Sequence, residues 1–290
     1  MFSKVKKMIA AAAWGHRRVD DLDRKLQLVL ANQYKIMGLA ARPSIVDAEF
    51  SSYSQNGEDG SLLMIFSVIG AQSKVAVELC AGDGIECNAA NLILNHGWTG
   101  LLFDGDQSSI DAGRQFYARR TNAWRSSRVA PKLVTAWITK DNVDGLIVEN
   151  GISGEVDLLS LDLDGVDYWI WDAIKSIDPR VVVLEYNNRW APEDSVTVPY
   201  ADNFVGLGAS VAGEGYFGAS LTAFKKLGAT KGYRLIGANG PNTNAYFMRQ
   251  GVGETDFPEV SVESCLSSQY ALNQRTTSNP NRLGRPLVAI

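Results

Sequence analysis

Acidic residues gather directly after one apolar run of the sequence. Asp162, Asp164 and Asp167 follow the run that ends at Leu161. Asp162 and Asp164 are two positions apart, so an extended chain directs both side chains to the same side. Two such carboxylates repel each other unless a cation or a shared proton relieves the charge. We therefore expect these residues to hold a positively charged group or to handle a proton.

The next apolar run also ends in polar side chains. Glu185, Asn187 and Asn188 follow Val181–Leu184, and oxygen ligands of this kind suit magnesium, manganese or calcium better than zinc. The candidate catalytic residues are therefore Asp162, Asp164 and Glu185, and the candidate metal ligands are Asp162, Asp164, Glu185 and Asn187. The alternative is that Asp164 and Gly165 form a turn that caps the following helix, while Glu185 faces solvent.

A glycine-containing segment lies between the first apolar run and a predicted helix. Gly82 and Gly84 let the backbone turn sharply and approach a ligand. The dinucleotide motif GxGxxG would place its third glycine at Cys87, and the acids Asp83 and Glu86 would repel a pyrophosphate. S-adenosylmethionine carries a sulfonium and an ammonium, which acids such as Glu78 and Asp83 attract. The alternative is an ordinary strand-to-helix turn.

A second acidic position supports a nucleoside-containing cofactor. Asp104 lies 22 residues beyond Gly82, at the end of the next apolar run. An acid at this place can accept hydrogen bonds from both ribose hydroxyls, and Asp106 is the second candidate. A solvated turn rich in Asp and Gly is the alternative.

These residues require a sheet that brings strand ends together. Several apolar runs contain consecutive apolar residues, which is typical of parallel strands covered on both faces by helices. The sequence predicts an α/β fold with a doubly wound, mostly parallel sheet flanked by helices. The expected strands are Val75–Leu79, Gly100–Asp104, Lys132–Ile138, Val156–Leu161, Val181–Glu185, Arg234–Ala238 and Ala245–Arg249. Residues 190–215 show no periodicity and are expected to form a long loop over the strand ends.

The N-terminal part has a different pattern. Apolar residues recur with spacings of three and four, which is a heptad pattern. This pattern predicts a helix that ends before Pro43. The positions are Val19, Leu22, Leu26, Val29 and Ile36, with Gln33 in the remaining place. The helix either packs on its own domain or pairs with a second subunit through residues 17–40. We expect a helical segment over residues 1–42 and one α/β domain over residues 43–290.

The composition of the chain indicates which classes of partner it can bind and in which compartment it lies. The 290 residues are 46% hydrophobic and 21% charged, with a net charge of −4, which is typical of a globular protein without a general attraction to nucleic acid. No segment has the length of a membrane span, although residues 1–18 could lie on a membrane surface. The three cysteines suit neither a disulfide framework nor a cysteine-ligated zinc site, so we expect a cytoplasmic protein.

Taken in order along the chain, five blocks resemble one family. They are YSQNGEDG at 53–60, VELCAGDGIECNAANLI from Val77, GWTGLLFDGD from Gly97, VDLLSLDLDGVDYWIWDAI from Val156 and RVVVLEYNN from Arg180. This order resembles FkbM-like bacterial S-adenosylmethionine-dependent methyltransferases of class I, over about residues 50–250. The resemblance implies methylation of hydroxyls on sugars or natural-product scaffolds. It also implies that Glu78, Gly82 and Gly84 flank the cofactor's methionine part, that Asp104 holds its ribose, and that Gln55 approaches it.

A looser similarity concerns metal-dependent O-methyltransferases of macrolide sugars and catechol. It implies that Asp162 or Asp164 is the first magnesium ligand. In those enzymes the two later ligands are adjacent, whereas Tyr186 here separates Glu185 from Asn187.

The expected activity is therefore transfer of a methyl group from S-adenosylmethionine to an oxygen of a carbohydrate-like or natural-product acceptor. One alternative is a metal-dependent glycosyltransferase, in which Asp162-Leu163-Asp164 is a DxD motif that binds a sugar nucleotide. The other alternative is a non-catalytic assembly subunit that pairs through residues 17–40.

Overall fold

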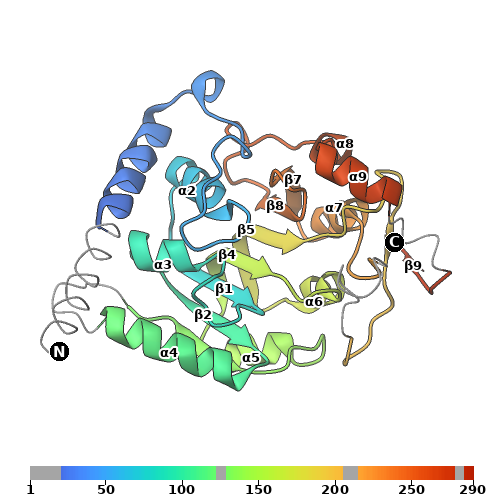
Figure 1. The fold of residues 1–290 in the computed structure, drawn as a ribbon, viewed down its shortest axis with the longest axis horizontal. Coiled ribbons are helices and arrows are strands. Elements are labelled where there is room, and N and C mark those ends of the chain that lie inside the picture. Colours follow the sequence, from blue (N-terminus) through green and yellow to red (C-terminus); the bar gives the residue numbers. More distant parts are fainter. Residues whose placement is uncertain (1–20, 122–128, 205–214, 278–283) are drawn as a thin grey trace, which may run out of the picture.

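The computed structural model describes residues 21–121, 129–204, 215–277 and 284–290 (Figure 1). Its centre is a sheet of seven strands in the order β3-β2-β1-β4-β5-β8-β7. The neighbours from β3 to β5 pair in parallel, whereas β8 is antiparallel to both β5 and β7. The bounds are β1 Val75–Leu79, β2 Thr99–Asp104, β3 Lys132–Thr135, β4 Gly154–Leu161, β5 Ile177–Glu185, β7 Tyr233–Ala238 and β8 Asn244–Arg249. All seven predicted strands are present.

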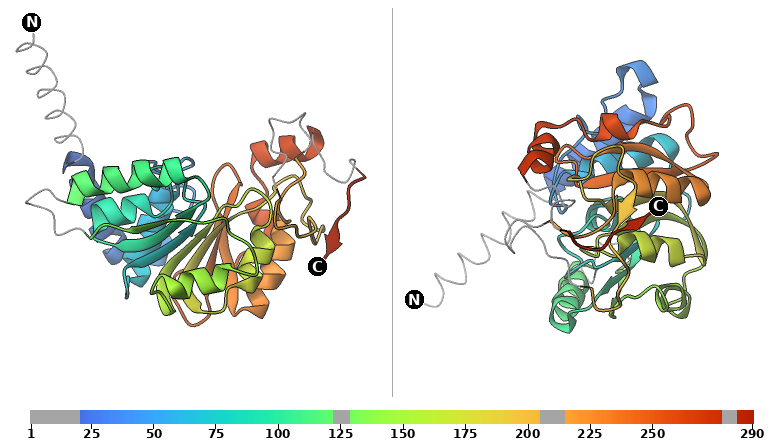
Figure 2. Two further views of the ribbon diagram at one scale, coloured as in Figure 1. Left: turned by 90° about the horizontal axis from the view of Figure 1, so that it is seen from below. Right: turned by 90° about the vertical axis from the view of Figure 1, so that its right-hand side faces the viewer.

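Helices cover both faces of this sheet, as the left view of Figure 2 shows. On one face α2 (Glu58–Ile69), α3 (Ala90–His96) and α4 (Gln107–Thr121) contribute to one apolar core. On the other face α5 (Val143–Glu149), α6 (Asp167–Ala173) and α7 (Leu221–Thr230) contribute to a second core. Val181 and Val183 enter the first core while Val182 and Leu184 enter the second, and all four side chains are fully buried. Burial on both faces explains why the strand is apolar at consecutive positions. The doubly wound α/β prediction is confirmed.

Short elements complete the molecule. Strand β6 (Val196–Thr197) pairs antiparallel with β9 (Val288–Ala289), so part of the predicted loop 190–215 is a strand, while residues 205–214 lie outside the described residues. The C-terminal region also contains α8 (Val262–Cys265) and α9 (Gln269–Thr277), and η1 (Leu39–Ala41) is a single 3-10 turn. None of these elements was predicted from the sequence.

The predicted N-terminal helix is present over residues 21–36. It packs beside the end of α3, where Gln27 Oε1 lies 2.7 Å from His96 Nε2 and Arg24 donates to the carbonyl of Asn95. Gln27 and Tyr34 are buried in this contact. Residues 1–18 and Val19, for which we predicted a membrane-surface contact and the start of the heptads, lie outside the described residues. In the described ranges, no helix combines the length and the apolar composition that crossing a membrane requires.

Candidate functional site

The segment 80–89 between β1 and α3 is the glycine loop. Gly82 has φ +57° and Gly84 has φ +67°, a region that favours glycine. A Cβ on Gly84 would lie 2.9 Å from Leu102 Cδ1, whereas a Cβ on Gly82 would meet no atom within 4 Å. Gly84 therefore serves internal packing, while the open space at Gly82 lets a ligand approach the backbone.

Asp83 and Gln55 shape the outer part of the glycine loop. Asp83 Oδ1 accepts hydrogen bonds from the backbone N–H groups of Ile85 and Glu86, at 2.8 and 3.4 Å. The exposed Gln55 donates from Nε2 to Glu86 Oε1 at 2.7 Å. The segment before α2 thus contacts the glycine loop, and the approach of Gln55 to a cofactor stays a prediction.

Glu78 lies beneath the loop and is buried. Its carboxylate accepts hydrogen bonds from the N–H groups of Asn88 and Ala89 and from the Ser160 hydroxyl, at 2.8 to 3.0 Å. Burial raises the pKa of Glu78, and these donors oppose that rise. Glu78 therefore fixes the path of the chain into α3, and its contact with the methionine part of a cofactor stays a prediction.

Asp104 connects the glycine loop to the end of β2. Its Oδ2 accepts from Gly82 N and its Oδ1 from Asp106 N, both at 2.8 Å. Asp106 is exposed and caps the start of α4 by accepting from Ser108 and Ser109. The Ser108 hydroxyl and the other donors lower the pKa of Asp106 to about 2. Asp104 therefore links the end of β2 to the glycine loop, and its contact with a ribose stays a prediction, whereas Asp106 is used by the helix terminus.

The ends of β4 and β5 bring three carboxyl groups together, which we name the acid cluster: Asp162, Asp164 and Glu185. One oxygen of each lies within 4.8 Å of the others. Asp164 adopts φ +53°, and Asp167 fixes this turn by accepting from the N–H groups of Leu163 and Gly165. The predicted meeting of the two strand ends is confirmed for these residues.

The surroundings of the acid cluster oppose the ionisation of its carboxyl groups. Desolvation, with the charges of Asp167 and Asp164, raises the pKa of Asp162 to about 7. Desolvation and the charge of Asp162 likewise raise the pKa of Glu185. Glu185 Oε2 is buried and has no hydrogen-bond partner among the described residues. An unsatisfied buried oxygen beside other carboxyl groups is suited to a cation or a shared proton.

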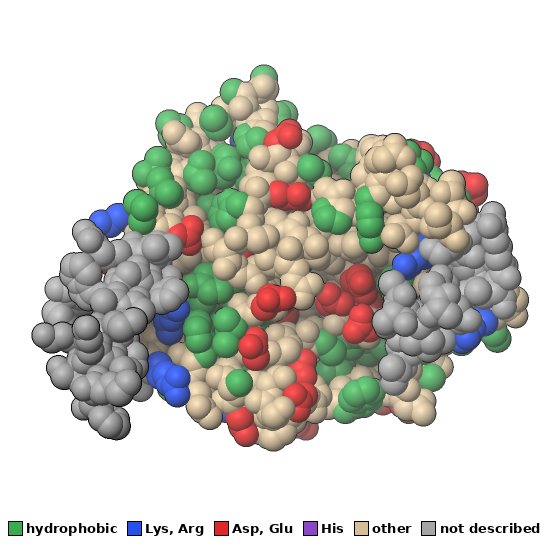
Figure 3. Space-filling view, in the orientation of Figure 1, with side chains coloured by type: hydrophobic (Ala, Val, Ile, Leu, Met, Phe, Trp, Pro, Cys, Tyr) green, Lys and Arg blue, Asp and Glu red, His purple; other side chains and the backbone are tan. Residues whose placement is uncertain are grey.

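The glycine loop follows β1 and the acid cluster follows β4 and β5, so both lie at the carboxyl edge of the sheet, where open α/β sheets bind ligands; we call this edge the crevice. Cys80 lies between them at φ +61°; desolvation raises the pKa of its thiol, and the nearby charges of Asp167, Asp104 and Asp162 raise it further. In Figure 3 acidic side chains gather in the middle of the face, in the region where β4 and β5 end. Acidic surroundings disfavour the thiolate, so we assign Cys80 no nucleophilic role.

Asn187 makes its contacts beyond the strand end. Its Nδ2 donates to the carbonyls of Gly215 and Phe217, at 2.8 and 3.0 Å, and its Oδ1 accepts from Arg189 N. The side chain thereby ties the segment after β5 to residues 215–217. The metal-binding role predicted for Asn187 stays a prediction.

The sequence analysis missed Trp137. The predicted strand continued to Ile138, but β3 ends at Thr135, and Trp137 is 57% exposed. Its Nε1 donates to the carbonyl of Asp202, and a Cβ on Gly105 would lie 3.2 Å from its ring. The indole of Trp137, which lies beside Asp104, offers a flat surface for stacking with a nucleobase. The signal in the sequence was a Trp near the end of the predicted strand Lys132–Ile138.

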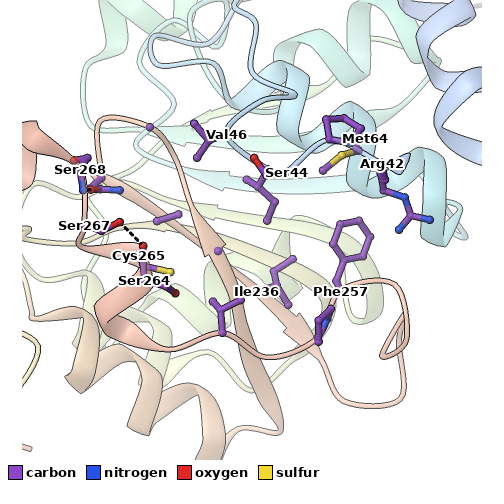
Figure 4. Close-up of a pocket in the computed structure, with 18 of the residues that line it drawn as sticks. Arg42, Ser44, Val46, Met64, Ile236, Phe257, Ser264, Cys265, Ser267 and Ser268 are labelled. Carbon is purple, nitrogen blue, oxygen red and sulfur yellow. Dashed lines mark hydrogen bonds between the residues drawn. The ribbon is translucent and has the colours of Figure 1, made fainter. Parts of the chain in front are cut away.

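A separate cavity of about 570 Å³ lies at the end of the edge strand β7 (Figure 4). It is lined mainly by apolar side chains, among them Ile236 and Phe257. Two charged residues line it, Arg42 and Asp256, and they pair with each other at 3.0 Å. Strand β8 separates β7 from the acid cluster at β5 in the sheet order, and we assign this cavity no catalytic role.

Comparison with known proteins gives structural likenesses only. No family model and no curated protein matches the chain. The magnesium protoporphyrin IX methyltransferase of Synechocystis PCC 6803 with bound SAM is similar at TM-score 0.40 and 10% identity, over 77% of this chain and 97% of that chain. An S-adenosylmethionine-dependent methyltransferase of Clostridium acetobutylicum is similar at TM-score 0.37 and 10% identity, over 63% and 87%.

The mitomycin 7-O-methyltransferase is similar at TM-score 0.34 and 14% identity, over 62% of this chain and 51% of that chain. These likenesses are weak. The fold assignment rests on the strand order and directions.

Proposed function

We propose that this chain transfers a methyl group from S-adenosylmethionine to an oxygen of a carbohydrate-like or natural-product acceptor. The observation that carries the proposal is the junction of Gly82 and Asp104. The N–H of Gly82 donates to Asp104 at 2.8 Å, and the space above Gly82 is open. A nucleoside in this crevice would present its ribose hydroxyls to Asp104 and its base to the indole of Trp137.

The charge of the crevice favours this cofactor over a dinucleotide. Asp83, Asp104 and the acid cluster line the crevice, and carboxylates attract the sulfonium and ammonium of S-adenosylmethionine. When bound, the cofactor would supply an activated methyl group. The chain's own task is then to align the acceptor and to take up its hydroxyl proton.

The acid cluster is suited to that proton transfer. A general base works best when its pKa lies near the operating pH, and the pKa of Asp162 is raised to about 7. Glu185, which lies in the same cluster, can share the proton. We assign proton handling to these two residues.

The same oxygens fit a divalent cation. Asp162, Asp164 and Glu185 provide the hard oxygen ligands that magnesium prefers, and Glu185 Oε2 lacks another partner. Such an ion would lower the pKa of an acceptor hydroxyl. Turnover with and without a chelator distinguishes this role from proton handling by carboxylates alone.

Isothermal titration calorimetry with S-adenosylmethionine and S-adenosylhomocysteine tests the proposal. We expect both to bind, and Asp104→Ala to weaken binding at least tenfold because the ribose loses its acceptor. Asp111→Asn, an exposed acid on α4, is the matched control and should bind normally. Absence of binding to wild-type protein, with binding of UDP plus manganese instead, would support the glycosyltransferase alternative.

A second experiment identifies the acceptor. Saccharides, sugar nucleotides and natural-product scaffolds are incubated with the chain and isotopically labelled cofactor, and products are analysed by mass spectrometry. We expect a mass gain of one labelled methyl group on an acceptor with a free hydroxyl. Methylation confined to amines would overturn the oxygen assignment.

A further inference from the structure

The helix over residues 21–36 has two neighbouring apolar stripes. One stripe, with Tyr34 and the partly buried Leu30, packs on the chain's own domain. The other is open to solvent: Leu22, Leu26 and Val29 are 60%, 56% and 55% exposed, and Ile36 is 85% exposed. In Figure 3 hydrophobic side chains follow this helix, which is blue in Figure 1. Exposed apolar residues in one row mark an interaction surface.

Charged residues of both signs accompany the open stripe. Lys25, Lys35 and Asp21 are all exposed. Asp23 turns toward the domain, where it accepts hydrogen bonds from Gln27 and Ser52. The surface that the helix offers is therefore apolar in its centre, with two exposed lysines and one exposed aspartate around it.

The chain immediately before this helix extends the positive charge. Residues 1–18 contain Lys4, Lys6, Lys7, Arg17 and Arg18 and no acidic residue, a formal charge of +5. The rest of the chain has 23 basic and 32 acidic residues, a charge of −9. Such a division of charge between one terminus and the body indicates a negatively charged partner for the terminus.

A second copy of the chain fits this surface poorly. A parallel helix pair would bring two segments of charge +5 together. An antiparallel pair centred between Leu26 and Val29 would place polar Gln33 against Leu22 of the other copy. An anionic lipid surface accepts the apolar stripe among its acyl chains and the basic residues among its headgroups.

We propose that residues 1–36 dock this protein on an anionic membrane surface, with the stripe Leu22, Leu26, Val29 and Ile36 inserted at the headgroup boundary. The helix over residues 21–36 lies on the outside of the layers, beside α3 (Figure 1). This inference does not depend on the proposed methyl transfer.

Flotation of the full chain with vesicles tests the docking. Vesicles of phosphatidylcholine with 30% phosphatidylglycerol are compared with phosphatidylcholine alone. We expect the chain to bind the anionic vesicles and to bind neutral vesicles at least tenfold more weakly. High salt should release it, because dissolved ions screen the attraction between its basic residues and the anionic headgroups.

Two variants separate the contributions. Leu22→Ser with Leu26→Ser and Val29→Ser removes the stripe, and Lys4→Gln with Lys6→Gln and Lys7→Gln removes three charges; each should lower the bound fraction at least tenfold. Val148→Ser with Leu272→Ser changes exposed apolar residues elsewhere and should bind like wild type. Circular dichroism verifies that all variants are folded.

Two results would overturn the proposal. One is equal binding of the stripe variant and wild type to anionic vesicles. The other is no vesicle binding by wild type, together with a dimer in sedimentation that the stripe variant abolishes, which would make a second copy the partner.

Discussion

At the scale of single residues, Asp162 gives the site its pH dependence. Because its pKa is raised to about 7, we expect the rate of methyl transfer to rise with pH through about 7, as Asp162 loses its proton and becomes a base. Asp162→Asn should lower the rate by about 10²–10⁴ and remove this limb of the profile. Rates between pH 5.5 and 8.5 at saturating cofactor test this. An unchanged limb in Asp162→Asn would assign the titration to another group.

Trp137 gives a second prediction for a single residue. Stacking of a nucleobase on an aromatic side chain contributes about 1–3 kcal/mol, so Trp137→Ala should weaken cofactor binding by about 5-fold to 150-fold. Trp137→Phe keeps a flat ring and should retain most of the affinity. Calorimetry of both variants tests the stacking, which is refuted if the two bind equally.

At the scale of elements, a buried ion pair fixes the start of the central strands. Arg180 on β5 donates to Asp157 on β4 at 2.8 Å, and their side chains are 5% and 0% exposed. Asp157 also accepts from the N–H groups of Gln72 and Lys74, which lead into β1. The pair therefore connects three strands at the edge opposite the crevice.

Removing one partner leaves a buried charge without compensation, which costs about 3–5 kcal/mol. We expect Asp157→Ala to lower the free energy of unfolding by that amount in urea titrations. Glu259→Ala breaks a pair whose side chains are 33% and 51% exposed, so it should cost at most about 1 kcal/mol. Equal losses in the two variants would contradict the buried role of Asp157.

Elements with a local pattern were predictable, and elements that depend on distant contacts were not. The fully buried run Val181–Leu184 indicates a central strand by itself. Strand β6 exists because Val196 pairs with Ala289, which lies far along the sequence. The same holds for the site. The positions of the strand ends predicted the acid cluster. The sequence spacing did not reveal that the glycine loop turns back so that its N–H groups at Asn88 and Ala89 donate to Glu78.

At the scale of the whole molecule, acids with raised pKa values determine how stability depends on pH. Desolvation raises the pKa values of Asp59 and Asp167 to about 6 and that of Asp162 to about 7. A group whose pKa is higher in the folded than in the unfolded chain stabilises the fold at low pH, and this contribution disappears as pH rises through the folded pKa. Burial lowers the pKa of His96 to about 4, which has the opposite effect below about pH 6.5.

Above pH 6.5 the contribution of the acid cluster therefore dominates, because the pKa of Asp162 is raised to about 7 and that of Glu185 well above its ordinary value. We expect the free energy of unfolding to fall by about 0.5 kcal/mol between pH 6.5 and 8, a value reduced because Asp162 is exposed to solvent. Asp162→Asn cannot ionise and should be more stable than wild type at pH 8, with a flatter dependence, while Asp111→Asn should follow wild type. Urea titrations at the two pH values measure this, and a decline in Asp162→Asn as steep as in wild type would show that the acid cluster does not control stability.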